Sequence, residues 1–460
     1  MAELTELTAT ELVAGYRAGT LCPVEVTEAV LARIERLEPM LSALYAPDAE
    51  VARAAARASR RRWQSGEPLG PLDGIPVTLK ENIATRGTPT PLGTAATELT
   101  PAAEDAPAAA RVRECGGVLL GKTTMPDYGM LTSGLSSFHT ATRNPWDRAC
   151  TPGGSSAGAA AAAVAGYGPL HAGTDIGGSI RLPAGWCGIV GFKPSFGRVP
   201  VFPPYPGRVA GPMTRTVADA ALFMSVLALP DARDHLCLPF EEIPWLDVER
   251  DPAGLRVGVQ LDAGVGLAVD GEIRAAVEDA ARRFEAVGAF VEPVPPFLTR
   301  EMLDGLDRFW RARFAVEFAE LPAERRARIL PYIAEWVAGG AGLTGEQVYS
   351  GFAQIDAMAV AALRATGGFD VVLAPTCPVR APAFDQPSPT GDPARPFEHI
   401  AFTVPYNMSG QPAVSLNCGY TADGMPIGLQ ISGRRFADLA VLRAAAAFER
   451  LRPPQRPCPL

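Results

Sequence analysis

Apolar and polar residues alternate along the chain with the two periods of regular secondary structure. Apolar residues spaced three and four positions apart predict helices over residues 8–19, 25–37, 50–64, 106–114, 157–165, 270–287 and 436–451. Short apolar runs beside turn residues predict buried strands within residues 74–80, 117–120, 255–259 and 369–375. A hairpin is predicted for residues 413–431, with its turn at Ala422-Asp423-Gly424.

The order of these elements predicts the fold class. Strands alternate with helices from end to end, which is typical of an α/β protein with helices on both faces of one sheet. Because of the hairpin near the C-terminus, we expect a mixed, mostly β sheet core flanked by helices on both faces. Residues 296–366 are also helical but less regularly patterned, and they are rich in aromatic side chains between Phe309 and Trp336.

The composition excludes several classes of protein. Of the 460 residues, 47% are apolar and 20% charged, which excludes a mainly disordered chain. A net charge of −8 argues against nucleic-acid binding through a broad basic surface. The first residues carry two acids and no basic stretch before an apolar one, and the apolar run 157–170 is too short to span a bilayer. We therefore expect a cytoplasmic protein with neither a nucleic-acid nor a membrane partner.

Cysteine and histidine give no sign of a metal site. The eight cysteines are scattered without a C-x-x-C pair, and the chain has only four histidines. This pattern is typical of neither a disulfide scaffold nor a zinc site. We expect reduced thiols, no metal and no cofactor.

Two short motifs match well-known patterns without the context that their chemistry needs. Residues 116–123 match the phosphate-binding pattern G-x-x-x-x-G-K-[ST], but the variable positions form an apolar strand and no helix follows. Residues 154–158 match the G-x-S-x-G nucleophile elbow with Ser156 as nucleophile, but Pro145 and Pro152 prevent a central strand before it. His399 is the only histidine far enough downstream to act as its base. Both interpretations are therefore disfavoured.

The strongest chemical signal comes from three segments taken together, residues 74–82, 151–158 and 173–184. The first places Lys80 at the end of an apolar strand, where desolvation lowers the pKa of an amine and allows it to act as a base. The other two are glycine-rich, expose backbone N–H groups, and each presents a serine. This combination indicates a serine nucleophile that is activated without histidine, beside a cluster of N–H donors.

The combination closely resembles the amidase signature family. Lys80, Ser155 and Ser179 match the lysine, the cis-serine and the nucleophilic serine of that family. One small departure is Ala157, where many members carry glycine. The resemblance runs from about residue 8 to about residue 450 and includes residues 187–194, 211–216 and 423–430. It implies a single amidase domain over residues 1–460, in which the variable helical segment 296–400 lines the substrate pocket.

The resemblance also implies a mechanism. Ser179 attacks the amide carbonyl carbon, and Ser155, held by a cis peptide bond, relays the proton between Ser179 and Lys80. The oxyanion hole would be formed by backbone N–H groups, those of Ile176, Gly177, Gly178 and Ser179. Among the other residues, Asp175 and Arg181 would brace this loop, and Ser156 and Thr151 would be supporting hydrogen-bond partners. A lysine base implies an activity optimum above neutrality, at roughly pH 7.5–9.5.

Three functions are compatible with parts of this pattern. The favoured one is a stand-alone hydrolase of small carboxamides, with aryl amides, anilides or carbamates as further substrates and with its oligomeric state, including a homodimer, left open. The alternative is the glutaminase subunit of an aminoacyl-tRNA amidotransferase, but such subunits usually carry Gln where this chain has Leu182, and residues 200–211 also differ. A catalytically inactive scaffold is disfavoured by the complete set of Lys80, Ser155 and Ser179. The aromatic residues at 309–336 indicate either an aryl substrate or ordinary core packing.

Overall fold

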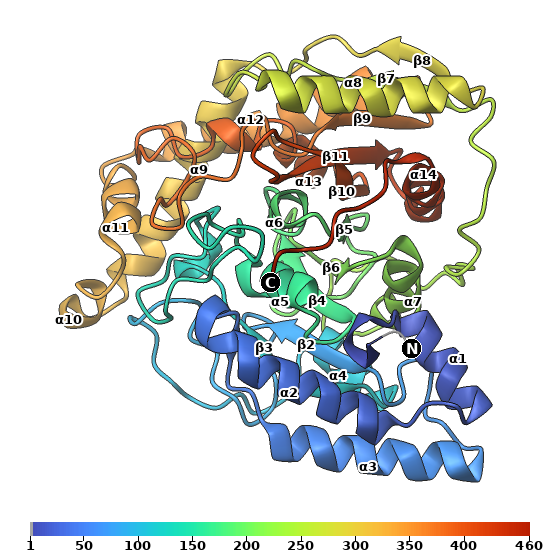
Figure 1. Cartoon of the computed structure of the whole chain (residues 1–460). Helices are drawn as coiled ribbons and strands as arrows, with labels where there is room; N and C mark the ends of the chain where they lie inside the picture. Colours follow the sequence, from blue (N-terminus) through green and yellow to red (C-terminus); the bar gives the residue numbers. More distant parts are fainter. Residues whose placement is uncertain (1–2) are drawn as a thin grey trace.

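The computed structural model describes residues 3–460, and an eleven-stranded mixed sheet runs through the molecule (Figure 1). The strands lie in the spatial order β1 (Leu44–Tyr45), β3 (Val118–Thr123), β2 (Pro76–Lys80), β4 (Leu170–Asp175), β6 (Val209–Thr214), β5 (Val190–Lys193), β10 (Ala413–Tyr420), β11 (Pro426–Gly433), β9 (Val371–Pro375), β7 (Arg256–Val259) and β8 (Phe290–Pro293). Strands β3, β2 and β4 are parallel, the middle of the sheet is antiparallel, and β9, β7 and β8 are again parallel. The predicted mixed α/β sheet is confirmed.

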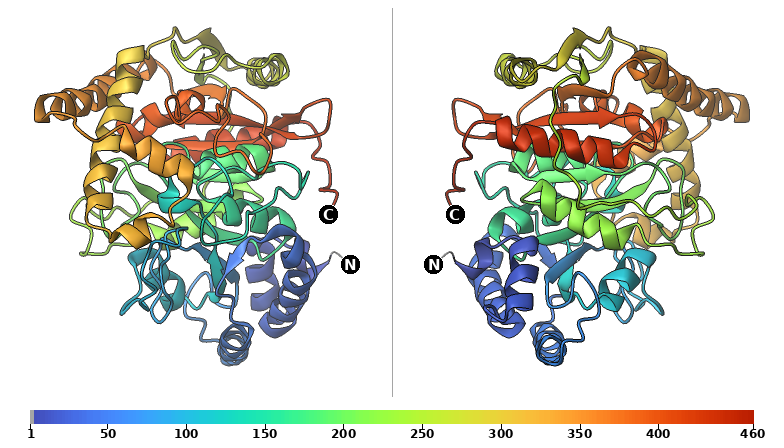
Figure 2. Two further views of the ribbon diagram at one scale, coloured as in Figure 1. Left: turned by 90° about the vertical axis from the view of Figure 1, so that its left-hand side faces the viewer. Right: turned by 90° about the vertical axis from the view of Figure 1, so that its right-hand side faces the viewer.

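Helices cover both faces of this sheet. One face carries α1 (Ala9–Ala18), α4 (Pro107–Glu114), α7 (Val217–Leu227), α8 (Gly271–Ala286) and α14 (Asp438–Leu451). The other carries α2 (Pro23–Leu41), α3 (Ala49–Ser65), α5 (Ala157–Ala165) and α6 (Arg181–Cys187). A further group lies together at one side of the molecule: α9 (Arg300–Ala319), α10 (Ala323–Arg326), α11 (Pro331–Ala338) and α12 (Gly345–Thr366) (Figures 1 and 2). The short helix α13 (Val404–Met408) packs against α12.

Every helix that the sequence predicts is present, with ends shifted by a few residues. Helix α1 begins at Ala9 because the Thr8 side chain accepts from the Glu11 N–H while the Glu11 carboxylate accepts from the Thr8 N–H. Helix α2 begins at Pro23, a residue that needs no hydrogen-bond acceptor for its nitrogen. The predicted helical region 296–366 contains α9 to α12.

Helix α5 is made almost entirely of alanine and glycine because it is buried against neighbouring main chain. A Cβ atom placed on Gly158 would lie 2.2 Å from the Ala43 carbonyl oxygen and 2.5 Å from the Thr124 nitrogen. Only glycine allows so close an approach. This packing fixes the start of α5, which follows directly after Ser155 and Ser156.

The segment that matches the phosphate-binding pattern forms no such loop. Lys122 lies inside strand β3, and its Nζ donates to the Ile83 carbonyl oxygen at 2.6 Å. Burial lowers the pKa of this lysine to about 8. Since the lysine is held inside the sheet and starts no helix, the expectation against nucleotide binding here agrees with the structure. None of the helices in residues 3–460 is long and apolar enough to cross a membrane.

Candidate active site

The candidate site lies where two neighbouring parallel strands end. Lys80 is the last residue of β2 and Asp175 is the last residue of β4, and Leu79 pairs with Ala172 between them. The carboxyl ends of parallel strands leave a crevice above the sheet, where ligands of α/β proteins commonly bind. The chain enters helix α5 from Ser155 and Ser156 beside this crevice.

Lys80 and two serines form a buried cluster. The Lys80 Nζ lies 2.7 Å from the Ser155 Oγ and 3.0 Å from the Ser156 Oγ. Lys80 and Ser156 are fully buried, and Ser155 is 4% exposed. The peptide bond between Gly154 and Ser155 is cis. The structure therefore brings Lys80 and Ser155, which lie 75 positions apart in the sequence, into direct contact.

The two serine hydroxyls have different roles toward the amine. The Ser156 hydroxyl donates to the Thr174 carbonyl oxygen at 3.3 Å. Its oxygen is therefore free to accept an N–H of Lys80, since a hydroxyl has one proton to donate and two lone pairs. The Lys80 amine also donates to the Ser155 Oγ, and when the amine is neutral the Ser155 hydroxyl can instead donate to its lone pair.

Burial lowers the pKa of Lys80 to about 7, from its ordinary value of 10.5. The negative charges of Asp175 and Glu81 oppose this shift, and the positive charge of Arg208 adds to it. No carboxylate oxygen of residues 3–460 lies within 4.0 Å of the Lys80 amine, so desolvation outweighs the opposing charges. At mildly alkaline pH the amine is mostly neutral and can accept a proton.

Ser179 lies in the turn of residues 176–180, between β4 and α6, which we call the Ser179 turn. Its side chain is partly exposed, in contrast to the fully buried Ser156. The Ser156 N–H donates to the Ser179 carbonyl oxygen at 3.1 Å, which joins this turn to the start of α5. The Ser179 turn therefore adjoins the segment that carries Ser155 and Ser156.

The backbone N–H groups of the Ser179 turn are not equivalent. The Gly178 N–H donates to the Asp175 Oδ1 at 2.8 Å, and the Ile180 N–H donates to the Asp175 Oδ2 at 3.1 Å. The Gly178 amide, one of the four donors predicted for the oxyanion hole, therefore has a buried carboxylate as its acceptor in this structure. Within residues 3–460, the amides of Ile176, Gly177 and Ser179 have no such acceptor.

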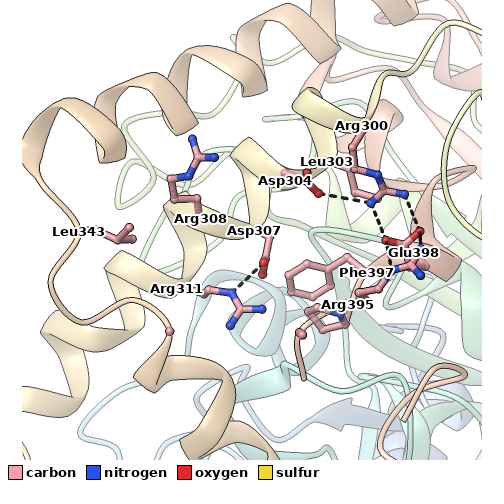
Figure 3. A pocket seen from close by; sticks show the side chains of 13 residues that line it. Arg300, Leu303, Asp304, Asp307, Arg308, Arg311, Leu343, Arg395, Phe397 and Glu398 are labelled. Atoms are coloured by element: carbon pink, nitrogen blue, oxygen red, sulfur yellow. Dashed lines mark hydrogen bonds and ion pairs between the residues drawn. The ribbon is translucent and has the colours of Figure 1, made fainter. Parts of the chain in front are cut away.

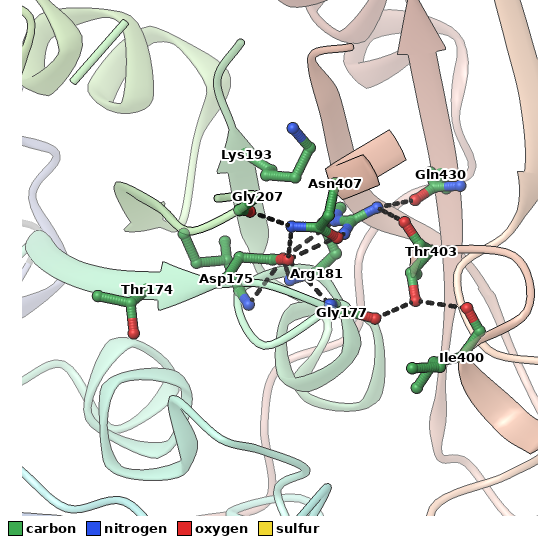
Figure 4. Close-up of polar contacts among 12 residues, drawn as sticks. Thr174, Asp175, Gly177, Arg181, Lys193, Gly207, Ile400, Thr403, Asn407 and Gln430 are labelled. Carbon is green, nitrogen blue, oxygen red and sulfur yellow. Dashed lines mark hydrogen bonds and ion pairs between the residues drawn. The ribbon is translucent and has the colours of Figure 1, made fainter. Parts of the chain in front are cut away.

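A buried ion pair supports this turn (Figure 4). The Arg181 Nη2 lies 2.9 Å from the Asp175 Oδ1, and both side chains are fully buried. Burial alone would raise the pKa of Asp175, but the charge and hydrogen bonds of Arg181 hold it well below its usual range. The carboxylate is therefore ionised, and it fixes the amides of Gly178 and Ile180.

Three residues from the C-terminal third of the chain complete the shell of Arg181 (Figure 4). Its guanidinium donates to the Thr403 carbonyl oxygen at 2.8 Å, to the Gln430 Oε1 at 2.7 Å and to the Asn407 Oδ1 at 2.6 Å. The Thr403 hydroxyl also donates to the Gly177 carbonyl oxygen at 2.6 Å. Sequence reasoning missed Thr403 and Asn407. The only signal was that Gln430 ends one of the segments that carry the family resemblance.

Comparisons with known proteins identify the family. The family model described as Amidase matches residues 25–442, which is most of the chain. The chain belongs to the amidase signature family. It is 36% identical to an acylamidase of Rhodococcus erythropolis, over 97% of this chain and 96% of that protein. It is also 36% identical to a glutamyl-tRNA(Gln) amidotransferase subunit of Myxococcus xanthus, over 97% and 98% of the two chains.

Solved structures of this family have the same fold. A bacterial aryl acylamidase superposes with a TM-score of 0.88 at 32% identity, covering 97% of this chain and 96% of the other. A 6-aminohexanoate cyclic dimer hydrolase superposes with a TM-score of 0.88 at 29% identity, covering 99% of both chains. The protein is an amide hydrolase of the amidase signature family.

Ser156 and Thr151, the two residues predicted as supporting hydrogen-bond partners, have different surroundings. Ser156 contacts Lys80 directly, as described above. The Thr151 Oγ1 accepts from the N–H groups of Gly134 and Gly153, both at 3.2 Å. Thr151 therefore shapes the chain before Gly154 and acts at a distance from the Lys80 amine.

The nucleophile-elbow interpretation lacks its central contact in this amidase. Ser156 is fully buried at the start of α5 and follows a loop instead of a strand. The His399 Nε2 lies 2.6 Å from the Thr132 Oγ1, and burial lowers the pKa of His399 to about 3. The histidine is therefore neutral and engaged with another residue.

A cavity of about 250 Å³ lies beside the Ser179 turn and has aromatic walls. Phe309, Trp310 and Tyr205 line it. A Cβ atom placed on Gly177 would lie 3.6 Å from the Trp310 Cη2 and 3.2 Å from the Ile400 Cδ1, so this wall adjoins the turn. By contrast, Phe314 and its neighbours Phe318 and Trp336 pack against one another as core. The core interpretation thus applies to these three residues, whereas Phe309 and Trp310 also border a cavity.

A larger and more open cavity of about 570 Å³ lies elsewhere, between α9 and residues 394–398 (Figure 3). Several charged side chains that line it form ion pairs with one another. The Arg300 guanidinium lies 2.6 Å from the Glu398 carboxylate, and the Arg311 Nε lies 2.7 Å from the Asp307 Oδ2. Lys80, Ser155 and Ser179 are not among its lining residues. Across residues 3–460, no group of three or more His, Cys, Asp or Glu side chains is placed to hold a metal ion.

Proposed function

We propose that this amidase hydrolyses small carboxamides, aryl amides among them, through an acyl-enzyme on Ser179. The observation that carries the proposal is the buried amine of Lys80, 2.7 Å from the Ser155 Oγ, with its pKa lowered to about 7. The aromatic wall of Phe309 and Trp310 supports an aryl substituent, as does the similarity to the acylamidases.

The first half of the reaction forms the acyl-enzyme. The Ser179 Oγ attacks the amide carbonyl carbon as its proton passes to the Ser155 Oγ, and the Ser155 proton passes to the neutral Lys80 amine. The carbonyl oxygen becomes an oxyanion. When the C–N bond breaks, the Lys80 ammonium returns its proton through Ser155 to the departing amine.

The oxyanion forms beside the Ser179 turn, where amides of Ile176, Gly177 and Ser179 are free to donate. Backbone donors held in fixed positions stabilise a developing charge without first having to reorient. Asp175 and Arg181 hold the turn that carries these donors, and the loss of one such donor typically costs about 2.7–4 kcal/mol of transition-state stabilisation.

The second half of the reaction releases the acid. A water molecule attacks the acyl carbon and gives its proton through Ser155 to Lys80, which is again neutral after the amine has left. The Ser179 oxygen then takes that proton back as the ester bond breaks. The proposed cycle uses the side chains of Ser179, Ser155 and Lys80, the backbone amides of the Ser179 turn, and water.

The glutaminase alternative has the support of the amidotransferase subunits that are 34–36% identical to this chain. Against it, the position after Arg181 is Leu182, a buried apolar side chain that packs on the Ser179 turn. A Cβ atom placed on Gly178 would lie 2.6 Å from the Leu182 Cδ1. This contact offers no amide group to a polar substrate, so we favour the stand-alone hydrolase.

A substrate panel tests the proposal. The purified chain alone is assayed with an aliphatic amide, an anilide, an aryl ester, a carbamate and glutamine. We expect turnover of amides, with the anilide included, that is lost in Ser179→Ala and kept in Ser65→Ala, a change at an exposed serine at the end of α3. Turnover of glutamine but of no other substrate, or turnover only after partner subunits are added, would favour the amidotransferase alternative.

A further inference from the structure

A proline-rich loop of residues 200–208 borders the Ser179 turn. It leads into β6, whose first residue, Val209, pairs with Asp175. The Gly207 carbonyl oxygen accepts from the Asn407 Nδ2 at 3.2 Å (Figure 4). Arg208, the residue between Gly207 and Val209, is therefore held at the edge of the active site.

Arg208 forms no ion pair within residues 3–460, although the negative charge of Glu317 acts on it from beyond 4.0 Å. Its guanidinium is partly buried and donates to the Pro203 carbonyl oxygen at 3.4 Å, with its Cζ 5.5 Å from the centre of the Tyr205 ring. No carboxylate oxygen in residues 3–460 lies within 4.0 Å of it. The contrast is Arg181, which is fully buried but faces the Asp175 carboxylate. Burying a charge without a counter-ion is unfavourable, so an unpaired guanidinium in a cleft is unusual.

The surroundings of Arg208 belong to the catalytic end of the sheet. It lines a narrow cavity of about 20 Å³ together with Asn82 and Thr174. Asn82 follows Lys80 by two positions, and Thr174 comes directly before Asp175. The positive charge of Arg208 also contributes to the lowered pKa of Lys80. Arg208 therefore borders the same narrow space as Asn82 and Thr174, at the end of the sheet where Lys80 and Asp175 lie.

A second arginine on the far side of the loop makes the position more positive. The Arg313 Cζ of α9 lies 4.0 Å from the centre of the Tyr205 ring, so Tyr205 contacts both guanidinium groups. Arg313 has its own partner, the Glu317 Oε1 at 2.8 Å. Burial, and then the charge of Arg313, lower the pKa of Arg208. The negative charge of Glu317 opposes this shift less strongly, and a negative group bound at Arg208 would oppose it further.

We propose that Arg208 binds a carboxylate carried by the substrate, so that the preferred amides of this enzyme are anionic. The inference rests on the proposed function and deepens it by naming the class of substrate. A guanidinium presents a planar fork of N–H donors that matches the two oxygens of a carboxylate. Asn82 and Thr174 line the same narrow cavity, where the Asn82 Nδ2 donates to the Thr174 Oγ1 at 3.0 Å.

The test compares matched substrates that differ only in charge. One pair, succinamate and butyramide, carries the carboxylate on the acyl side; the other, 4-acetamidobenzoate and 4-methylacetanilide, carries it on the amine side. We expect the wild-type enzyme to prefer the anionic member of at least one pair. Arg208→Gln should then lower kcat/KM for that member by about 10- to 100-fold, mainly through KM, with a smaller effect on its neutral partner.

Two controls separate binding from a general effect. Arg208→Lys keeps a positive charge and should retain part of the preference, and Arg60→Gln, at an exposed position of α3, should change nothing. Titration of Ser179→Ala protein with succinamate and 4-acetamidobenzoate measures affinity without turnover, and Arg208→Gln should weaken binding of the preferred anion in that background.

The proposal is overturned if the wild-type enzyme prefers the neutral member of both pairs, or if Arg208→Gln lowers kcat/KM equally for both members of each pair. In the second case Arg208 acts only on Lys80 or on the shape of the loop. Failure of the proposed function has a different signature, since Ser179→Ala would then keep its activity on the neutral amides.

Discussion

The lowered pKa of Lys80 predicts a specific pH dependence. The base must be neutral to accept a proton, so activity is lost as pH falls through the pKa and is complete above it. With a pKa of about 7, the neutral fraction is about 0.09 at pH 6, about 0.5 at pH 7 and about 0.9 at pH 8. We therefore expect kcat/KM to rise about tenfold between pH 6 and pH 8 and then to level off.

Burial of Lys80 determines how large the neutral fraction of its amine is at a given pH. At the ordinary lysine pKa of 10.5, the neutral fraction at pH 8 would be only about 0.003, so burial raises the reactive fraction about 300-fold. This plateau agrees with the optimum above neutrality that a lysine base implies. It is lost in Lys80→Arg, because a guanidinium remains protonated throughout this range.

The assay measures kcat/KM between pH 5.5 and 9.5 on a neutral anilide at constant ionic strength. A histidine base is the alternative explanation for such an inflection. We choose His139 as a control because it contacts the buried carboxylate of Glu81, the residue that follows Lys80. The inflection should survive in His139→Gln and in His399→Gln. Its disappearance in either variant, with the fold preserved, would refute the lysine base.

Three further predictions concern the nucleophile, its turn and the helix behind it. Ser179→Ala should lower kcat by at least about 100-fold, more than Ser155→Ala, and a serine-directed phosphonate should label Ser179 in mass spectrometry; a label on Ser156 would contradict this. Asp175→Asn leaves the buried Arg181 without its counter-ion and should lower the free energy of unfolding by about 3–5 kcal/mol, and a denaturation midpoint equal to wild type would contradict the ion pair. Gly158→Ala should lower the free energy of unfolding by about 1–3 kcal/mol in the same denaturation experiment, because the added Cβ atom would overlap the Ala43 carbonyl oxygen.

The sequence predicted the fold class and most of the long helices, but it missed α6, α7, α13 and several strands. Strand β4 shows why strands were missed. Its residues, Leu170 to Asp175, include a histidine, a glycine and a threonine, so they form no apolar run. The strand is nevertheless buried throughout, since the His171 Nδ1 lies 2.7 Å from the Thr78 Oγ1 of β2 and burial lowers the pKa of His171 to about 3. A buried polar strand that is satisfied by its neighbours has no signature in hydrophobic periodicity.

The site was predictable where its residues stand in a local pattern. Lys80 ends an apolar strand and the serines lie in glycine-rich segments, at a recognisable spacing. The partners of Arg181 lie more than 220 positions away, at Thr403 and Asn407, and only the antiparallel middle of the sheet brings them together. The sequence also could not show that the Gly178 amide is already bound to Asp175, since that depends on how one turn folds.

The three charged groups of the site respond to burial in different ways, and the difference follows from their partners. Asp175 stays ionised because Arg181 supplies the opposite charge. Lys80 contacts only hydroxyl groups, so it escapes the penalty by losing its proton and becomes a base. Neither response is open to Arg208. A guanidinium does not deprotonate near neutral pH, and no carboxylate oxygen of residues 3–460 lies within 4.0 Å of it. A carboxylate on the substrate, the molecule that enters this crevice during turnover, would supply the counter-ion that we propose for Arg208.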